Sequence, residues 1–327
     1  MAPELRYHAA LTDAPLKLLV LMPVYEDWAS AAEVCRRMDA CIGEVDAAVE
    51  VVWINDGSQT DPRPAVRELR LRHIGRISVL QLRRNLGHQR AIAIGLAYAA
   101  TNLSAAALVI MDADGEDPPE QIPTLVREAV RLQLSSIVFA QRGRRVEGWR
   151  FRAFYFVYRM VHRLFTGRGI EIGNFSVMPW SLLAAIVVHP EIWNHYAAAV
   201  LQSRLPRAMI RLDRGHRIQG HSRMRFTDLV MHGLAALFAY HDVVSTRLLL
   251  GTVLLLLITS GALAALIATG AHLGMGTIAL VVTVGQFSTL ALLAAFLTVM
   301  NRSAQPFLPA RDYVHFVSGL TELSRRD

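Results

Sequence analysis

Five short apolar runs, separated by amphipathic segments, mark the first 140 residues of the chain. The runs are continuously hydrophobic rather than alternating, as is typical of parallel strands buried on both faces of a sheet. We predict strands at residues 17–22, 49–54, 77–82, 105–111 and 135–140. We predict helices between them at residues 30–42, 64–74, 87–100 and 119–132. This order predicts an α/β fold with a mostly parallel, Rossmann-like sheet and right-handed crossovers.

The pattern changes at residues 248–300, which contain no Lys, Arg, Asp or Glu. A helix needs about 20 apolar residues to cross a bilayer, so the stretch predicts a two-helix transmembrane hairpin, Leu248–Thr269 and Thr277–Met300. A buried hairpin of a soluble protein is the alternative, and the length of the run disfavours it. Because Arg247 and Arg302 flank the hairpin, the positive-inside rule places both ends in the cytoplasm.

These patterns divide the chain into four parts. We expect an α/β domain at 1–210, a basic juxtamembrane segment at 211–247, the transmembrane hairpin at 248–300 and a cytoplasmic tail at 301–327. The cytoplasmic side then also holds the α/β domain.

The composition agrees with a membrane protein that faces a reducing compartment. Hydrophobic residues make up 53% of the chain and charged residues only 19%, with a net charge of +7. Cys35 and Cys41 form no CxxC motif, no Cys/His metal spacing and no disulfide framework, which fits the cytosol. The first 17 residues lack the apolar core of a signal peptide, so we expect none.

Charged and glycine-rich loops follow the predicted strands. They read "PVYED" (23–27), "NDGSQTD" (55–61), "RRNLGHQRA" (83–91), "DADGEDPPE" (112–120) and "QRGRR" (141–145). In parallel α/β sheets the carboxyl ends of the strands share one edge, and ligands bind there. We therefore expect these loops to form the functional site.

The fourth loop carries four carboxylates within six residues. If the strand continues briefly, Asp112, Asp114 and Glu116 alternate onto one face and converge, which is unfavourable unless a cation lies between them. Carboxylate oxygens suit Mg²⁺ or Mn²⁺. An ion held by few carboxylates usually completes its shell with substrate phosphates, so the loop predicts a site for a nucleotide diphosphate.

Two other interpretations of this acidic loop compete with the metal site. One is a solvated turn closed by Pro118 and Pro119. The other is an EF-hand, which we exclude because the glycine stands at the fourth position and Pro123 stands at the twelfth, where the motif needs Glu. In the second loop, Asp56-Gly57 fits either an ordinary turn or an aspartate that binds a base or ribose.

Four ordered motifs, "MPVYED", "VVWINDGSQTD", "RRNLGHQRAIAIGL" and "MDADGEDPPEQIP", resemble the family 2 glycosyltransferases of the GT-A fold. The resemblance covers about residues 1–300 and is strongest to the polyprenyl-phosphate sugar transferases, many of which carry a C-terminal transmembrane hairpin. It implies an inverting, metal-dependent enzyme of the bacterial inner membrane, with Mg²⁺ or Mn²⁺ as cofactor. Its partners would be a UDP- or GDP-sugar donor and a lipid-linked acceptor such as polyprenyl phosphate. Whether a second copy of the chain joins it in a homo-oligomer stays open from the sequence.

The resemblance implies roles for particular residues. Around the nucleotide and its phosphates it places Pro23, Tyr25, Glu26, Asp56, Gly87, His88, Gln89, Asp112 and Ser222. Asp56 matches the aspartate that reads the base. The metal ligands that it implies are Asp112, Asp114 and Glu116. For Glu26, an ordinary surface acid is the alternative.

The catalytic residues that the resemblance implies are Asp114, Arg142 and Arg223. Arg142 follows the fifth strand and would face the pyrophosphate, unless it is an ordinary surface arginine. Arg217, Ser222 and Arg223 match a segment that closes over the donor phosphates. The arginines would stabilise the leaving group where its charge develops.

The stretch 204–225 carries seven arginines opposed only by Asp213. One interpretation is that these arginines bind the phosphates of the nucleotide sugar. The alternative is attraction to anionic lipid, which is worth about 1 kcal/mol per charge near the membrane surface. We do not expect nucleic acid as a partner, because the stretch adjoins the predicted hairpin.

One motif departs from the polyprenyl-phosphate branch. Where that branch usually has Gly-Asp-Phe-Arg, this chain has "GNFS" at 173–176, without the acid and the base. Neutral hydrogen bonds to a sugar or polyol acceptor could instead come from Asn174, Ser176, His195 and Tyr196. A hydroxyl acceptor needs a general base, for which the sequence offers Asp117 or Glu191. The alternatives are therefore transfer to a hydroxyl of a glycolipid or saccharide, and a non-catalytic nucleotide-sugar-binding membrane component.

Overall fold

The computed structural model describes residues 15–142, 160, 163–164, 172–213, 215–218, 240–269, 274–303 and 307–325. The chain forms two compact units. The first comprises residues 1–146, 171–225 and 307–327, and the second comprises residues 147–170 and 226–306. Of the segment 301–327 that was predicted to be a separate cytoplasmic tail, the first unit includes residues 307–327.

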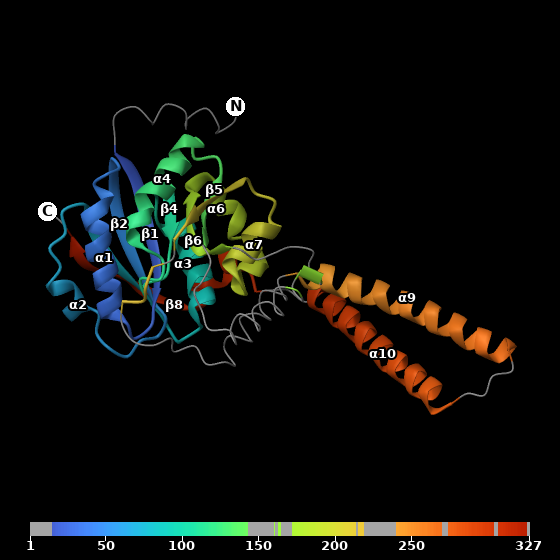
Figure 1. Ribbon diagram of the computed structural model, residues 1–327. Coiled ribbons are helices and arrows are strands. Elements are labelled where there is room, and N and C mark those ends of the chain that lie inside the picture. The colour runs from blue at the N-terminus through green and yellow to red at the C-terminus, as the bar shows by residue number, and fades with distance from the viewer. Residues whose placement is uncertain are drawn as a thin grey trace, which may run out of the picture. The chain divides into compact units, whose positions relative to one another are not determined.

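Eight strands of the described residues form one sheet in the order β7-β5-β6-β4-β1-β2-β3-β8 (Figure 1). The strands are β1 Leu16–Val24, β2 Ala47–Asn55, β3 Ile74–Leu82, β4 Ala107–Ile110, β5 Ile137–Arg142, β6 Ile172–Pro179, β7 Arg207–Leu212 and β8 Val317–Arg325. All are parallel except β6, which runs antiparallel to β4 and β5, and β8, which runs antiparallel to β3. The predicted mostly parallel α/β fold is confirmed.

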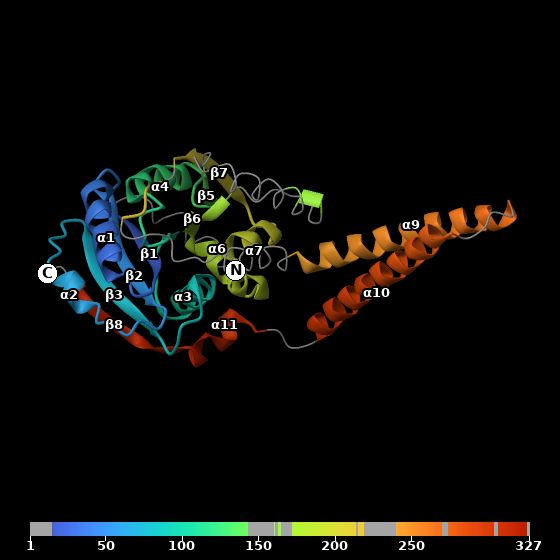
Figure 2. The same cartoon turned by 60° about the horizontal axis from the view of Figure 1, so that its bottom comes forward.

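Helices cover both faces of the sheet. The α-helices of this unit are α1 Trp28–Ile42, α2 Arg63–Arg67, α3 His88–Asn102, α4 Ile122–Arg131, α6 Trp180–Ile186, α7 Tyr196–Gln202 and α11 Pro309–Asp312. Short 3₁₀ helices are η2 Pro119–Gln121, η3 Pro190–Trp193 and η4 Tyr313–His315. Figure 2 shows α1 and α4 over one face and α3 over the other.

The continuous apolar runs form strands because each strand is buried on both sides. In β1, Leu18, Val20 and Met22 pack with α1 and α4, whereas Leu19 and Leu21 pack with α3 and α7. Successive side chains point to opposite faces, so a strand between two helical layers needs apolar residues at every position.

One predicted helix is much shorter than expected. The predicted helix 64–74 ends at Arg67, and Ile74 already belongs to β3. The buried carboxylate of Asp39 accepts hydrogen bonds from the backbone N–H groups of Arg72, His73 and Ile74 at 2.7–2.9 Å. These bonds hold the chain extended where it enters β3, and a helix would place the same N–H groups elsewhere.

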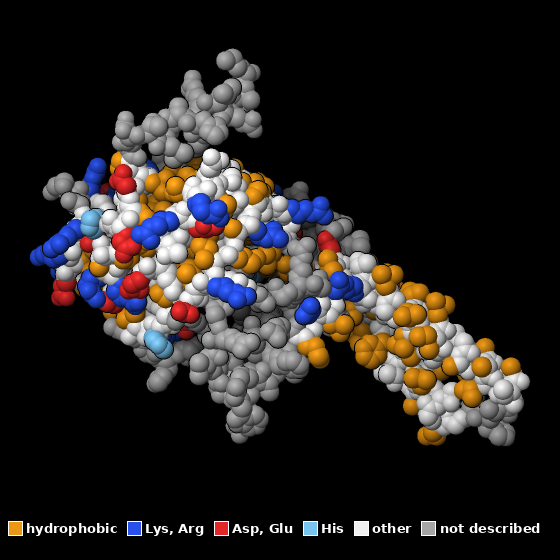
Figure 3. Space-filling view, turned by 45° about the horizontal axis from the view of Figure 1, so that its top comes forward, with side chains coloured by type: hydrophobic (Ala, Val, Ile, Leu, Met, Phe, Trp, Pro, Cys, Tyr) orange, Lys and Arg blue, Asp and Glu red, His pale blue; other side chains and the backbone are white. Residues whose placement is uncertain are grey.

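The second unit contains α9 His241–Ala268 and α10 Met275–Ser303, which lie side by side (Figures 1 and 2). Both are long and apolar enough to cross a membrane, with a mean hydropathy of 2.3 for Asp242–Ala268 and 2.0 for Met275–Leu297. Hydrophobic side chains are spread over their surface in Figure 3. Leu257, for example, is 67% exposed. The two predicted apolar helices are thus confirmed, and exposed apolar surface of this extent marks an interaction site.

Candidate functional site

The loops after β1, β2, β3 and β4 lie at one edge of the sheet, because these four strands are parallel neighbours. Three of these loops turn through a glycine with positive φ: Gly57 at 79°, Gly87 at 89° and Gly115 at 85°. Residues with a side chain rarely adopt this conformation. The sequence therefore builds three tight turns at the edge where ligands bind in such sheets.

Glu26 joins the first loop to the second. Its own φ is 51°, unusual for a residue with a side chain. Its carboxylate accepts hydrogen bonds from the Gln59 backbone N–H and from the Thr60 hydroxyl. The Trp28 ring nitrogen donates to the Thr60 hydroxyl at 2.9 Å. Of the other first-loop residues predicted to contact the nucleotide, Pro23 lies within β1 and Tyr25 is 50% exposed at the same edge.

Asp56 joins the second loop to the third. The side chain is buried, and its two carboxylate oxygens accept the backbone N–H groups of Leu86 at 2.7 Å and Gly87 at 2.8 Å. Burial raises the pKa of Asp56 against these hydrogen bonds, which lower it. Asp56 therefore holds the turn that begins α3, which is a positioning role that the sequence did not suggest. A base contact by Asp56 stays a prediction.

The acidic loop has a different shape from the predicted one. Strand β4 ends at Ile110, and residues 113–117 form turns and bends, so the strand-like alternation of Asp112, Asp114 and Glu116 is wrong. The Asp114 carboxylate accepts the Glu116 backbone N–H at 3.0 Å. The physical reason is Asp117, which is 2% exposed and accepts the Asp112 backbone N–H at 3.1 Å, curling the loop back on itself.

Asp117 therefore shapes the turn from a buried position, which the interpretation of the loop as a solvated turn does not explain. Its burial also removes it from contact with an acceptor, so the hypothesis of Asp117 as a general base loses support. The other candidate base, Glu191, lies in η3, where one carboxylate oxygen is 3.8 Å from the His189 imidazole.

A later segment of the chain lies on the acidic loop. The Gly215 N–H donates to the Glu116 carbonyl at 3.0 Å, and the Ile218 N–H donates to the Asp114 carbonyl at 2.9 Å. A Cβ atom on Gly215 would lie 2.4 Å from the Gly115 carbonyl oxygen, so only glycine permits this approach. The segment is thus fitted to the loop backbone.

This segment brings Arg217 to the acidic side chains. One guanidinium nitrogen is 3.6 Å from the Asp114 carboxylate, and another is 4.0 Å from the Asp27 carboxylate. The sequence predicted that Arg217 lies near the donor phosphates but did not single out Asp27. The signal for Asp27 was its place directly after Glu26, where the first loop enters α1.

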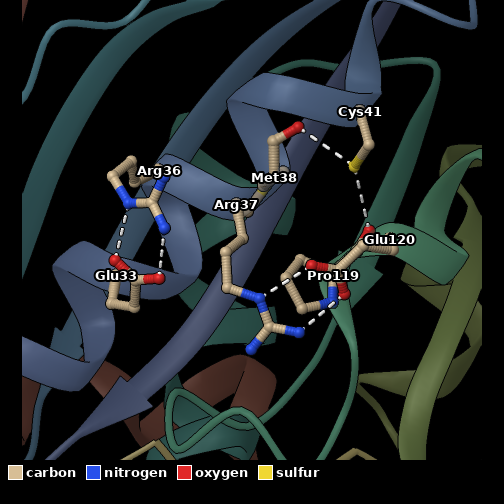
Figure 4. Close-up of polar contacts among 7 residues, drawn as sticks. All are labelled: Glu33, Arg36, Arg37, Met38, Cys41, Pro119 and Glu120. Atoms are coloured by element: carbon tan, nitrogen blue, oxygen red, sulfur yellow. Dashed lines mark hydrogen bonds and ion pairs between the residues drawn. The ribbon is translucent and has the colours of Figure 1, made fainter.

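The exit of the acidic loop is attached to α1 (Figure 4). The Arg37 guanidinium donates two hydrogen bonds to the Glu120 carboxylate, at 2.7 and 2.8 Å. The Cys41 sulfur lies 3.2 Å from the Met38 carbonyl oxygen and 3.4 Å from the Pro119 carbonyl oxygen, so its single S–H is shared between these two acceptors. These contacts fix η2, so the loop is held at both ends by secondary structure.

Asn174 contacts the acidic loop from β6. Its amide nitrogen is 3.3 Å from the Asp112 carboxylate, and its amide oxygen accepts a hydrogen bond from Gln89 at 3.0 Å. Gln89 also accepts the Tyr196 backbone N–H at 2.8 Å. The predicted donor-site residue Gln89 is therefore buried and reaches the acidic loop through Asn174.

The structure does not support the remaining predicted acceptor residues. Ser176 and Tyr196 are fully buried, and their hydroxyls are 2.9 Å apart. Burial also raises the pKa of the Tyr196 hydroxyl. His195 is 5% exposed, and its Nδ1 accepts the Ala198 backbone N–H at 3.4 Å, capping α7. These side chains stabilise the fold behind the site.

For three predicted catalytic or donor-site residues, the side chains lie outside the described part of the structure. The backbone of Arg142 ends β5 and pairs with Leu212 of β7, but the Arg142 side chain is outside the described part of the structure. Ser222 and Arg223 are outside the described residues altogether.

The carboxylates of the acidic loop fit only a metal site in which substrate phosphates supply some of the ligands. Among the residues that the structure describes, no three His, Cys, Asp or Glu side chains gather closely enough to hold an ion, so the predicted triad with Glu116 is not formed as a cage. Asp112 and Asp114 remain, on one loop beside Arg217. Mg²⁺ is commonly held by one or two carboxylates together with substrate phosphates, and this donor set fits such a site.

A family model described as "Glycosyl transferase family 2" matches residues 19–185, about half of the chain. The chain belongs to glycosyltransferase family 2. The matched residues run from within β1 to α6 and include the four loops described above. The family predicted from the four motifs is confirmed.

Curated relatives in this glycosyltransferase family carry the name undecaprenyl-phosphate 4-deoxy-4-formamido-L-arabinose transferase. The one from Sodalis glossinidius is 31% identical over 163 residues, which are 50% of this chain and 47% of the relative. The one from Aeromonas hydrophila is 25% identical over 220 residues, 66% of this chain and 65% of the relative. The chain thus matches about half of the first relative's length.

Among solved structures, the chain is similar to glucosyl-3-phosphoglycerate synthase from Mycobacterium tuberculosis, crystallised with Mn²⁺, UDP-glucose and phosphoglyceric acid. The TM-score is 0.51 at 16% identity, covering 73% of this chain and 82% of the synthase. This similarity shows a GT-A fold for the first unit (residues 1–146, 171–225 and 307–327), which we call the glycosyltransferase unit.

Proposed function

We propose that this protein is a membrane-anchored glycosyltransferase that moves a sugar from a UDP- or GDP-sugar to polyprenyl phosphate. The observation that carries the proposal is the acidic loop at the carboxyl edge of the sheet, where Asp114 faces Arg217 at 3.6 Å. The names of the relatives from Sodalis glossinidius and Aeromonas hydrophila, which specify undecaprenyl phosphate, support this acceptor class.

Asp112 and Asp114 would hold a divalent cation, either Mg²⁺ or Mn²⁺. The cation would neutralise charge on the leaving diphosphate. The synthase from Mycobacterium tuberculosis, crystallised with both Mn²⁺ and UDP-glucose, supports this assignment. Glu116, the third predicted ligand, contributes its backbone N–H to Asp114 and helps to orient that carboxylate.

The chain's own residues prepare the leaving group and its binding site. Arg217 supplies positive charge beside Asp114, where phosphate oxygens would lie, and Arg142 and Arg223 are proposed to add to it. Asp56 and Glu26 fix the three loops that surround the nucleotide. Attack from the face opposite the leaving group would invert the anomeric carbon.

A phosphate acceptor agrees with the site better than a hydroxyl acceptor. A phosphate oxygen is already anionic and needs no general base, whereas a hydroxyl requires proton removal. Ser176 and Tyr196, which the sequence offered as neutral acceptor ligands, are fully buried. Asp117, the candidate general base in the acidic loop, is only 2% exposed, which disfavours contact with an acceptor hydroxyl.

The helices α9 and α10 would anchor the protein in the bacterial inner membrane as a hairpin. Their length and hydropathy support spanning, and the flanking Arg247 and Arg302 support a cytoplasmic glycosyltransferase unit. That side also holds nucleotide sugars, so the orientation agrees with the donor.

The test is a transfer assay with the full chain in lipid nanodiscs. Radiolabelled UDP- and GDP-sugars, including one with the 4-deoxy-4-formamido-L-arabinose of the relatives' names, are supplied with Mn²⁺ and undecaprenyl phosphate. We expect labelled lipid with the unaltered chain, and at least a 100-fold lower rate with Asp114→Asn, whereas Asp61→Asn on the exposed second loop keeps the rate. Label on a glycolipid hydroxyl, with none on undecaprenyl phosphate, would establish the alternative acceptor. No transfer from any donor would overturn the proposal.

A further inference from the structure

We propose that Asn174 is a positioning residue for Asp112, held by Gln89 so that an amide N–H points at the carboxylate. The inference deepens the proposed function and rests on it, because it gives Asp112 a role at the donor site. It concerns the "GNFS" motif at residues 173–176, which lacks the acid that is usual in the polyprenyl-phosphate branch.

The direction of the hydrogen bonds follows from one backbone group. The Tyr196 backbone N–H can only donate, so the Gln89 atom that it meets at 2.8 Å is the amide oxygen. The Gln89 amide nitrogen therefore donates to the Asn174 amide oxygen at 3.0 Å. The Asn174 nitrogen is then the atom that faces Asp112, at 3.3 Å. We call this series of bonds, from Tyr196 through Gln89 and Asn174 to Asp112, the amide relay.

The other groups around Gln89 agree with this assignment. The second N–H of the Gln89 amide faces His88 Nε2 at 3.0 Å, where a neutral imidazole nitrogen can accept it. Every polar atom of the Gln89 amide thus has a partner. A reversed Gln89 amide would set its nitrogen against the Tyr196 N–H, donor against donor.

The strands place Asn174 opposite Asp112. In the antiparallel pair of β4 and β6, Ile110 lies opposite Ser176. The pairing stops there, and two residues beyond it the Asn174 amide meets the Asp112 carboxylate at 3.3 Å. Asn174 is thus part of β6, and Asp112 lies on the acidic loop two residues beyond the end of β4.

Because Asn174 and Gln89 are buried, losing a hydrogen bond of the amide relay costs free energy. Asn174 is 5% exposed and Gln89 is 8% exposed, so water cannot readily replace a lost partner. An aspartate at position 174 would set a second carboxylate against Asp112. Asparagine instead supplies a donor that holds Asp112 as an acceptor facing the acidic-loop site.

The test measures Mn²⁺-dependent binding of UDP and GDP by calorimetry, with the full chain in nanodiscs. In Asn174→Ala the amide N–H that hydrogen-bonds to Asp112 is lost. We expect the affinity for UDP or GDP, measured in the presence of Mn²⁺, to fall about 10–100-fold, as for other residues that orient metal ligands. The thermal midpoint without metal should also fall, because the buried Gln89 amide loses a partner, and a buried control variant separates this loss of stability from the loss of affinity. In the transfer assay, the KM for the nucleotide sugar should rise.

Gln89→Glu provides a second variant of nearly equal size. The glutamate still accepts the Tyr196 N–H, but its other oxygen now faces Asn174 and forces that amide to turn its oxygen toward Asp112. We expect a loss of affinity similar to that of Asn174→Ala. The double variant should lose no more than either single variant, since all three interrupt one relay.

Ser176→Ala is the matched control. Ser176 is fully buried in the same strand, and its hydroxyl contacts the Tyr196 hydroxyl and the Asn174 backbone carbonyl, each at 2.9 Å. It therefore contacts neither of the side-chain amides that form the relay. We expect it to lower the thermal midpoint and to leave Mn²⁺-dependent affinity unchanged. Equal nucleotide affinity of the unaltered chain, Asn174→Ala and Gln89→Glu would overturn the relay. Absence of Mn²⁺-dependent binding in the unaltered chain would instead overturn the proposed function.

Discussion

Arg217 lies 3.6 Å from the Asp114 carboxylate, although the two residues are far apart in the sequence. The segment around Arg217 follows β7 and returns across the acidic loop, held there by two backbone hydrogen bonds. A cation and an anion of the protein are thereby placed at the same point, where a diphosphate with its metal would join them.

Arg217→Gln should slow transfer about 100-fold, because it removes positive charge from the developing leaving group. The measurement is the steady-state rate with saturating nucleotide sugar. Arg63→Gln serves as the control, since Arg63 is an exposed arginine paired with Asp61 on the second loop. A rate within twofold of the unaltered chain in Arg217→Gln would show that Arg217 has no part in the reaction.

Asp56→Ala should loosen the turn before α3 and lower the free energy of unfolding by about 1–3 kcal/mol, since two buried N–H groups lose their acceptor. Amide hydrogen exchange should accelerate specifically at Leu86 and Gly87. Asp61→Ala, an exposed aspartate in the same loop, should change neither property. Unaltered protection of those two amides in Asp56→Ala would contradict the positioning role.

Gly57→Ala should destabilise the glycosyltransferase unit by about 1–3 kcal/mol. The φ of Gly57 is 79°, and a Cβ atom would lie 2.5 Å from the Asn85 backbone nitrogen, which cannot swing away as a side chain would. At Gly75 a Cβ atom would meet its nearest neighbour, the Val49 carbonyl oxygen, at 3.6 Å. Gly75→Ala should therefore be nearly neutral in thermal unfolding, and equal costs of the two substitutions would refute the argument.

Both cysteines should react slowly with iodoacetamide in the folded protein at pH 8. Burial raises the pKa of Cys35 to about 12 and that of Cys41 to about 11. The thiolate is the reactive form, so at pH 8 alkylation should be at least about 100-fold slower than for a free cysteine with a pKa near 8.5. Mass spectrometry should show both thiols modified once the protein is denatured. Rapid modification of Cys35 before denaturation would contradict its burial.

The sequence predicts the first five strands well because their signal is local. A strand buried on both faces needs apolar side chains throughout, and β1 to β5 have them. Strands β6, β7 and β8 were not predicted, because their place in the sheet depends on distant partners. In β7, for example, half-buried and exposed positions alternate, and arginines occupy exposed ones.

In the candidate site, too, the sequence predicts the features that depend on local patterns and misses those that depend on distant contacts. The loops and their shared edge follow from strand order, so the sequence places Asp56, Asp112 and Asp114 at that edge, and their roles toward a ligand stay predictions. The roles of Gln89 and Asn174 depend on the antiparallel register of β4 with β6, which no local pattern reveals. The shape of the acidic loop depends on Asp117, whose burial follows from the packed fold.

Removing residues 317–325 should make the glycosyltransferase unit self-associate. These residues form β8, which pairs with β3 along Ile77–Leu82 and adjacent positions. Without β8, β3 becomes an open edge with unpaired N–H and C=O groups, which invite pairing with another chain. Size-exclusion chromatography of the truncated chain in detergent should show aggregates, whereas a monodisperse peak would show that β3 needs no cover.

The position of β8 in the chain also sets an order for biosynthesis. The ribosome makes β1 to β7 first, then α9 and α10, and only afterwards the strand that closes the sheet. Until the two apolar helices have left the ribosomal tunnel, β3 cannot receive β8. Completion of the glycosyltransferase unit therefore follows synthesis of α9 and α10, and a nascent chain stalled before α9 cannot acquire the full sheet.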